Sequence, residues 1–174
     1  MAHPEHLEIL QAGVRTWNRW RQNNDKIRPN LRAADLKGAD LAGFDLQSVY
    51  LSRADLSRAY LFEANLSQTN FRDANLSHCC LIGTNLQQAY FSGANLYQAY
   101  LSQANLTGTY FGHANLEKAT LADSVVAHTY FSQANIKETD FSRVKDLQPL
   151  QLRMAHNFEQ AILTEAAAEQ VLPP

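Results

Sequence analysis

The sequence predicts an all-β solenoid: a four-sided parallel β-helix of about six coils, with α-helical caps at both ends. A large apolar residue stands at every fifth position from Leu31 to Phe141, which makes 23 positions without an exception. Phenylalanine recurs every twenty residues, at 71, 91, 111 and 131. Segments with a helical spacing of apolar residues flank this repeat. A period of five fits neither an α-helix nor a single strand, so it indicates a repeated unit of another kind.

Residues 1–28 are predicted to form an N-terminal helical cap. Leu10, Val14 and Trp17 lie roughly on one face of a helix over residues 4–22. A solenoid exposes its core at both ends unless another element covers it, so we expect this face to lie over the first coil.

The same helix offers a candidate docking face, made of Trp20 and the basic cluster Arg15, Arg19 and Arg21. A basic helix face is usually just solvated. The simpler interpretation, which we favour, is therefore that the segment is only a plug.

Each five-residue unit within residues 29–143 is predicted to be a short extended leg followed by a corner. A small residue, usually Ala, stands two positions before the large apolar residue, so both point inward from an extended segment. The residue between them, usually Asp, Asn or Tyr, points outward. The two residues after the large one are mostly polar or Gly and suit a turn.

The interval of twenty residues sets the number of legs in each coil at four. Residues n and n+20 are then vertical neighbours, so that like residues stack on like. The outward Asp and Asn residues form ladders on two opposite faces, where amides can hydrogen-bond along the column. The leucine-rich repeat also has a period in the twenties, but it needs a helical or irregular leg in each turn. Four equivalent legs argue against it.

Outward tyrosines are the most distinctive surface feature. Tyr90, Tyr110 and Tyr130 are expected to form a continuous stripe, with Tyr50 on the same face. Aromatic pairs across rungs stabilise sheets by themselves, which is the simpler interpretation. The alternative is a partner-binding face, since Tyr is favoured at interfaces. The candidate partner-binding residues are Tyr50, Tyr90, Tyr110, Tyr130 and Trp20.

Residues 144–174 are predicted to form a C-terminal helical cap and tail, because the five-residue rule fails after Arg143. Apolar residues follow one another there at spacings of four, which predicts helix; they are Leu150, Met154, Phe158 and Ile162. Pro149 and Asn157 would divide this helix into two.

The repeat resembles that of the pentapeptide-repeat family, whose motif is a small residue, Asp or Asn, Leu or Phe, a polar residue, then Gly or a polar residue. The units ADLKG, ADLSR, ANLSQ and ANLTG carry this resemblance, which extends from Pro29 to Arg143. It implies a right-handed quadrilateral β-helix. Many members come from cyanobacteria and have no assigned biochemical activity, and the FEQAI segment is similar to the helical tail of cyanobacterial members.

Composition excludes several classes of function. The formal net charge of −2 gives no long-range attraction for nucleic acid or anionic lipid. The sequence has neither a run of 18 apolar residues nor the basic and apolar regions of a signal peptide, so we expect no membrane span and no secretion. The two cysteines, Cys79 and Cys80, are adjacent and make a poor disulfide framework. A reducing, cytoplasmic location fits best.

The residues predict no enzyme, no cofactor and no metal site. Three histidines, at 78, 113 and 128, occupy corners on three different faces and cannot converge on one ion. No serine, cysteine or carboxylate stands in a recognisable nucleophile or acid–base arrangement, and the glycines form no phosphate loop.

The sequence therefore favours a non-catalytic, rigid scaffold, a monomer or weak dimer, whose flat faces bind an unidentified protein. We expect no binding of single-stranded nucleic acid to the Tyr stripe, because no basic groove accompanies it. The alternative follows from the resemblance: some pentapeptide-repeat proteins resemble duplex DNA and bind DNA gyrase. Those proteins are more acidic, dimerise through C-terminal elements and often carry loops. Here the repeats hold ten acidic and eight basic residues and no interrupting loop, which weakens that alternative.

Overall fold

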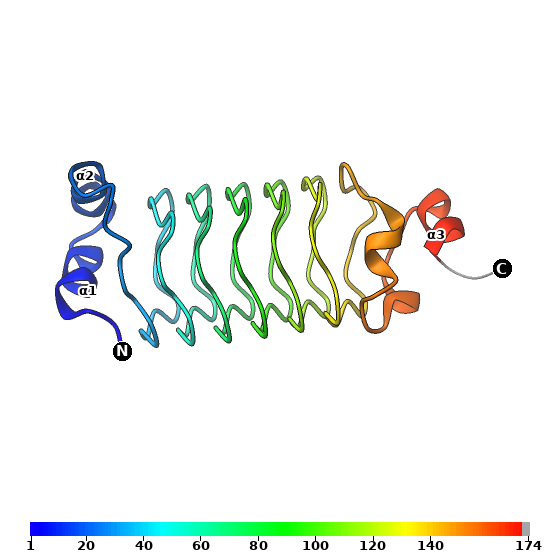
Figure 1. Cartoon of the computed structure of the whole chain (residues 1–174), viewed down its shortest axis with the longest axis horizontal. Helices are drawn as coiled ribbons and strands as arrows, with labels where there is room; N and C mark the ends of the chain where they lie inside the picture. Colours follow the sequence, from blue (N-terminus) through cyan, green and yellow to red (C-terminus); the bar gives the residue numbers. More distant parts are fainter. Residues whose placement is uncertain (172–174) are drawn as a thin grey trace.

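The computed structural model describes residues 1–171, which form an elongated column with helices at its two ends (Figure 1). Helices α1 (Pro4–Gln11) and α2 (Val14–Asn23) lie against the first coil. At the opposite end, the last coil is followed by two short 3-10 helices and one α-helix: η1 (Pro149–Leu152), η2 (Phe158–Gln160) and α3 (Glu165–Val171).

Parallel pairing of backbones twenty residues apart stacks the coils. The spacing is twenty in every bridge from Asn30 to Lys145; Asn75, for example, pairs with Asp55 on one side and Asn95 on the other. The Leu56 amide donates to Asn75 O at 2.7 Å, and the Asn75 amide donates to the carbonyl of the rung below at 2.9 Å. The prediction that residues n and n+20 are vertical neighbours is confirmed. Each leg pairs at one residue only, so the column is a β-helix built of minimal legs.

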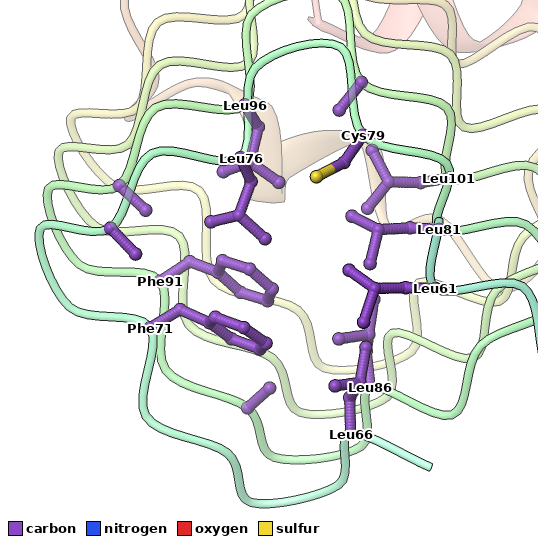
Figure 2. Packing of buried hydrophobic residues seen from close by; sticks show 14 of the residues in the cluster. Leu61, Leu66, Phe71, Leu76, Cys79, Leu81, Leu86, Phe91, Leu96 and Leu101 are labelled. Carbon is purple, nitrogen blue, oxygen red and sulfur yellow. The ribbon is translucent and has the colours of Figure 1, made fainter. Parts of the chain in front are cut away.

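The core is a stack of identical layers. All 23 of the large apolar residues at the five-residue spacing are buried. The rings of Phe71 and Phe91 are nearly parallel with centroids 4.7 Å apart, and Figure 2 shows them one above the other. Leu61, Leu81 and Leu101 form a second column facing them (Figure 2). Burying side chains of this size is worth about 1.5–3 kcal/mol each before conformational entropy is subtracted.

The corners need a left-handed backbone. The second residue after each large apolar residue has a positive φ at every corner from Ala33 to Glu138, between 54° and 71°. Val, Ile and Thr are absent from these 22 positions, because a branched Cβ is the least compatible with this conformation. Hydrogen bonds offset the strain: the Arg58 amide donates to Ser77 O at 2.9 Å, and the Ala59 amide closes the turn onto Leu56 O at 2.9 Å.

The N-terminal cap consists of two helices, whereas the sequence predicted one over residues 4–22. The chain breaks between α1 and α2 at Gly13, whose φ is 94°. The expected cover of the core is nevertheless present, because Leu10 and Trp17 are both buried. Phe44 replaces the usual small residue in the first coil and meets Trp17, with ring centroids 6.5 Å apart.

Helix α2 also takes the place of a missing rung. The Asn18 side chain donates from Nδ2 to Gly43 O at 2.9 Å and accepts the Asp45 amide on Oδ1 at 2.9 Å. Trp17 Nε1 donates to Asp45 O at 2.7 Å, and Arg21 Nη2 donates to Gln47 O at 2.9 Å. These side chains satisfy backbone groups that a preceding coil would otherwise pair.

The C-terminal segment differs most from the prediction. Instead of a helix with apolar residues at spacings of four, the chain forms a further, incomplete coil in which His156 pairs with Asn135 and Ile162 pairs with Asp140. The backbone of the last regular coil offers hydrogen bonds that outweigh the local helical pattern; the His156 amide donates to Ala134 O at 2.7 Å. Between residues 144 and 171, helix is thus confined to η1, η2 and α3, and residues 172–174 of the predicted tail lie outside the described part of the chain.

Candidate protein-binding face

A row of three stacked tyrosines lies on the outside of the column. Tyr90, Tyr110 and Tyr130 pair in successive rungs, so their side chains leave the backbone at equivalent points. Ring centroids are 5.2 Å and 4.7 Å apart, and the planes lie within 6° and 4° of parallel. The three residues are 46%, 39% and 53% exposed. The rings therefore face one another along the column and leave their edges and hydroxyl groups to solvent.

The residues at the corners on both sides of this row are small or uncharged. On one side they are Gln87, Gln88, Thr107, Gly108, Ala127 and His128; on the other they are Ser92, Gly93, Gly112, His113, Ser132 and Gln133. None of these residues is Asp, Glu, Lys or Arg. Tyr combined with Ser, Gly and amide side chains gives a large, adaptable contact area with little ordering cost.

The row ends in an apolar groove at the C-terminal end of the column. Tyr130 and Phe131 line it together with Leu150 and Met154 from the η1 region. Leu150 is 63% exposed and Met154 is 61% exposed. We call the surface formed by Tyr90, Tyr110, Tyr130, Leu150 and Met154 the tyrosine face. Exposed apolar side chains gathered in this way mark interaction surfaces in soluble proteins.

Of the other two predicted residues, Tyr50 lies on the same side of the column but outside the stacked row, and Trp20 lies elsewhere. Asn70 separates Tyr50 from Tyr90 in the column, and the Arg32 guanidinium lies 4.2 Å above the Tyr50 ring centroid. Trp20 lies at the opposite end of the molecule, half-buried against Trp17 and His6.

The basic cluster expected beside Trp20 is incomplete. Arg21 is buried against the first coil, where its guanidinium lies 3.7 Å from the Asp45 carboxylate. Only Arg15 and Arg19 are exposed, so the helix does not present three basic side chains together.

Leu150 and Met154 belong to the face, but the sequence pattern did not place them there. Both were assigned to the predicted helix because of their spacing of four. Leu150 is twenty residues after Tyr130, and this interval, applied beyond Arg143, would have placed it above the tyrosine row.

Charged side chains elsewhere on the column pair from rung to rung. Arg143 and Asp123 form an ion pair of 2.8 Å at one corner, and Lys118 lies 3.8 Å from Glu138 at another. Arg53 lies 3.9 Å from Asp73, on the edge of the column that continues into Gly93, His113 and Gln133 beside the tyrosine row. These exposed pairs contribute little to stability. The Arg143–Asp123 and Lys118–Glu138 pairs lie at other corners than the tyrosine face, whereas the Asp73 carboxylate lies directly below Gly93 at the start of this face.

The amide ladder forms as predicted. On one face the Asn Nδ2 groups donate to the Oδ1 of the residue one rung below: Asn75 to Asp55 at 3.1 Å, Asn95 to Asn75 at 3.3 Å and Asn115 to Asn95 at 3.3 Å. On the opposite face Asn65 and Asn85 donate in the same way. At the start of the ladder, hydrogen bonds from the Ser57 amide and hydroxyl lower the pKa of Asp55. These groups are already bound to one another, so the ladder offers few free donors to a ligand.

The candidate reactive groups are dispersed. Cys79 is buried and donates from Sγ to Leu56 O, and burial raises the pKa of its thiol to about 12, so it is a packing residue. Within residues 1–171, no three His, Cys, Asp or Glu side chains gather where they could hold a metal ion. In the same part of the chain, no helix has the length and apolar character needed to cross a membrane.

Comparison with protein families gives a match over most of the repeat. Pentapeptide repeats match in eight copies, over residues 30–68, 69–108 and 109–145. A comparison with curated protein sequences gives no match.

Similar solved structures include a pentapeptide repeat protein from the Arabidopsis thaliana thylakoid lumen. It is 25% identical with a TM-score of 0.42, over 80% of this chain and 88% of that one. Trypsin-treated QnrB1, a plasmid-mediated fluoroquinolone resistance protein, is 20% identical with a TM-score of 0.41, over 76% and 80% of the two chains. A pentapeptide repeat protein from Nostoc is 25% identical with a TM-score of 0.29, over 87% and 95%.

Proposed function

The chain belongs to the pentapeptide-repeat family, and we propose that it is a non-catalytic interaction protein, a rigid column that binds another protein through the tyrosine face. The observation that carries this proposal is the row of three half-exposed, mutually stacked tyrosines that ends in an apolar groove. Tyr and apolar anchors surrounded by small residues are the usual composition of binding surfaces.

Rigidity supports this proposal. Backbone pairing holds Tyr90 and Tyr110 on both sides and Tyr130 on one side, and each ring stacks on its neighbour. Side chains that are already ordered lose little conformational entropy on binding. A partner therefore meets a preformed surface.

The charge arrangement does not favour the alternative of a DNA mimic that binds gyrase. A DNA mimic needs rows of free anionic groups, whereas Asp73, Asp123 and Glu138 each lie beside a cationic side chain. A supercoiling assay decides between the two functions: inhibition of gyrase by micromolar protein would support the DNA mimic against the scaffold.

We further propose a cytoplasmic location. Both cysteines are free thiols in the described structure, and Cys79 is buried where it cannot pair. This arrangement is compatible with a reducing compartment.

A pull-down from the native host tests the binding face. We expect the wild-type chain to recover a partner that the triple variant Tyr90→Ser, Tyr110→Ser and Tyr130→Ser does not. The matched control is Tyr60→Ser with Tyr100→Ser, because these tyrosines are 59% and 52% exposed on a different face. Equal recovery by the wild-type and triple variant chains, both shown to be folded by circular dichroism, would reject the tyrosine face as the binding surface.

A further inference from the structure

We infer that the partner fitted by the tyrosine face is a second copy of this chain, so that two columns associate side by side. This inference rests on the proposed function and names the partner of the same face.

Charge is the first argument. In a two-fold symmetric contact the same patch meets itself, so a charged residue near the axis lies close to its own copy. Like charges there repel and destabilise the contact. Other corners of the column carry charged residues in neighbouring rungs, such as Lys118 below Glu138 and Asp123 below Arg143. The corner residues on both sides of Tyr90, Tyr110 and Tyr130 include no Asp, Glu, Lys or Arg, so this part of the surface can meet its copy without like-charge repulsion. Charged side chains lie at its two ends: Arg72 and Asp73 one rung below Tyr90, and Arg153 beside Met154.

The spacing of the rungs is the second argument. The tyrosine ring centroids repeat at 5.2 Å and 4.7 Å because the backbone rungs repeat at that interval. A second column has the same interval, so each rung of one copy can meet a rung of the other. A partner without this repeat would meet only some of the rungs equally well.

The order of residues along the face is the third argument. The face presents a large side chain in three successive rungs, at Tyr90, Tyr110 and Tyr130, and Leu150 continues it beside Tyr130 at the apolar groove. If the columns run in opposite directions about an axis between Tyr110 and Tyr130, Tyr90 meets Leu150 and the two inner tyrosines meet each other. If they run in the same direction, each side chain meets its own copy. Both arrangements cover the exposed Leu150, so the face is complementary to itself in either direction.

Sedimentation velocity over a series of micromolar concentrations tests the inference. We expect the wild-type chain to form dimers that dissociate on dilution. Tyr110→Arg should weaken dimerisation by about tenfold or more, because it brings two cations close together across the axis. Tyr100→Arg is the control: Tyr100 is 52% exposed on another face, and dimerisation should be unchanged.

A mixing experiment separates an interface from a loss of folding. Tyr110→Arg and Tyr110→Glu should each be monomeric alone and should form mixed dimers when combined, because the introduced charges then attract. A fold defect would not be repaired by mixing. A monomeric wild-type chain at all concentrations, or a dimer that Tyr110→Arg leaves intact, would overturn the inference.

The two proposals can fail separately. Suppose that the wild-type chain is monomeric, but that it recovers another protein in the pull-down which the triple Tyr→Ser variant does not recover. The tyrosine face then binds a heterologous partner, and only the inference of self-association is wrong. If the chain dimerises through a surface that Tyr110→Arg does not affect, the dimer exists but the face assigned to it is wrong.

Discussion

Asn157 donates from Nδ2 to Oδ1 of Asn135 at 2.9 Å and so extends the amide ladder one step beyond the regular repeat. Twenty-two residues separate the two, in place of the twenty between earlier members of the ladder. Asn157 also has a positive φ of 58°, which is typical of a corner in the column. The last segment thus uses the same interactions as the repeats, although its sequence spacing has changed.

This relationship explains how the column ends. Each coil offers the next a line of backbone donors and acceptors, and those left unpaired would cost free energy if buried. At the C-terminal end an irregular coil pairs with them. At the N-terminal end the side chains of Trp17, Asn18 and Arg21 do so.

Replacing Asn18 with Ala tests the N-terminal arrangement. The variant leaves Gly43 O and the Asp45 amide without their side-chain partner. We expect the free energy of unfolding to fall by about 1–3 kcal/mol, measured by urea denaturation. Gln22→Ala is the control, because Gln22 is exposed on the same helix and should change stability little. An equal effect of the two substitutions would contradict the role given to Asn18.

Ala94 tests why the inward partner of each large residue is small. Its side chain is buried in the middle of the column, between layers that repeat the same packing. We expect Ala94→Leu to overpack the core and lower the free energy of unfolding by about 1–3 kcal/mol. Ala42→Leu, at a half-exposed corner, is the control. Unchanged thermal stability of the Ala94 variant would mean that the column has internal space for a second large side chain in each leg.

The pH dependence of the N-terminal cap depends on His6. The backbone amide of Asn30 donates to Nδ1 of His6 at 3.0 Å, and an imidazole that accepts this hydrogen bond is neutral. Burial, and then the neighbouring His3, lower the pKa of His6 below its ordinary value of 6.5, although Glu5 acts in the opposite direction. The unfolded chain therefore binds more protons between the two pKa values, and stability should fall as the pH drops below about 6.5.

Thermal melting between pH 8 and pH 5 measures this effect (values chosen to bracket the ordinary histidine pKa of about 6.5). His6→Asn is the informative variant, because the side-chain oxygen of Asn can accept the hydrogen bond from the Asn30 backbone amide and the Asn side chain does not titrate. Its melting temperature should fall less than that of the wild type over the same range. His78→Asn serves as the control, since His78 lies at an exposed corner remote from the cap. Identical pH profiles of wild type and His6→Asn would exclude His6 as the source.

The sequence was sufficient to predict the column because one rule repeats. Each leg has one large and usually one small inward residue, and the interval of twenty fixes which residues are neighbours, so the sequence predicts that Phe71 and Phe91 lie together, as they do. The capping segments could not be predicted in the same way, since their backbone follows from hydrogen bonds offered by the column. Local spacing around Leu150 and Met154 predicted a continuous helix. The structure has only the short 3-10 helix η1 there, because the backbone that follows pairs with the last regular coil at His156 and Ile162.

The residues of the candidate site were likewise predictable only in part. The tyrosine stacks followed from the interval of twenty, and the structure confirms their geometry. The place of Trp20 did not follow, because its burial depends on how α1 and α2 fold against each other around Gly13. Surface residues within the repeat were thus predictable in position, whereas those in the caps were not.

The tyrosine row should also stabilise the column, and this contribution can be separated from binding. Tyr110 stacks on both Tyr90 and Tyr130, and aromatic pairs of this kind are worth about 0.5–1.5 kcal/mol each. We expect Tyr110→Ser to lower the free energy of unfolding by about 1–3 kcal/mol. Tyr100→Ser should cost less, because the neighbours of Tyr100 in its column are Cys80 and Thr120. Urea denaturation of Tyr110→Ser, Tyr110→Phe and Tyr100→Ser makes the comparison. Since the phenylalanine variant keeps both stacks, it should remain near wild-type stability, and any partner binding it loses then belongs to the hydroxyl group at the surface.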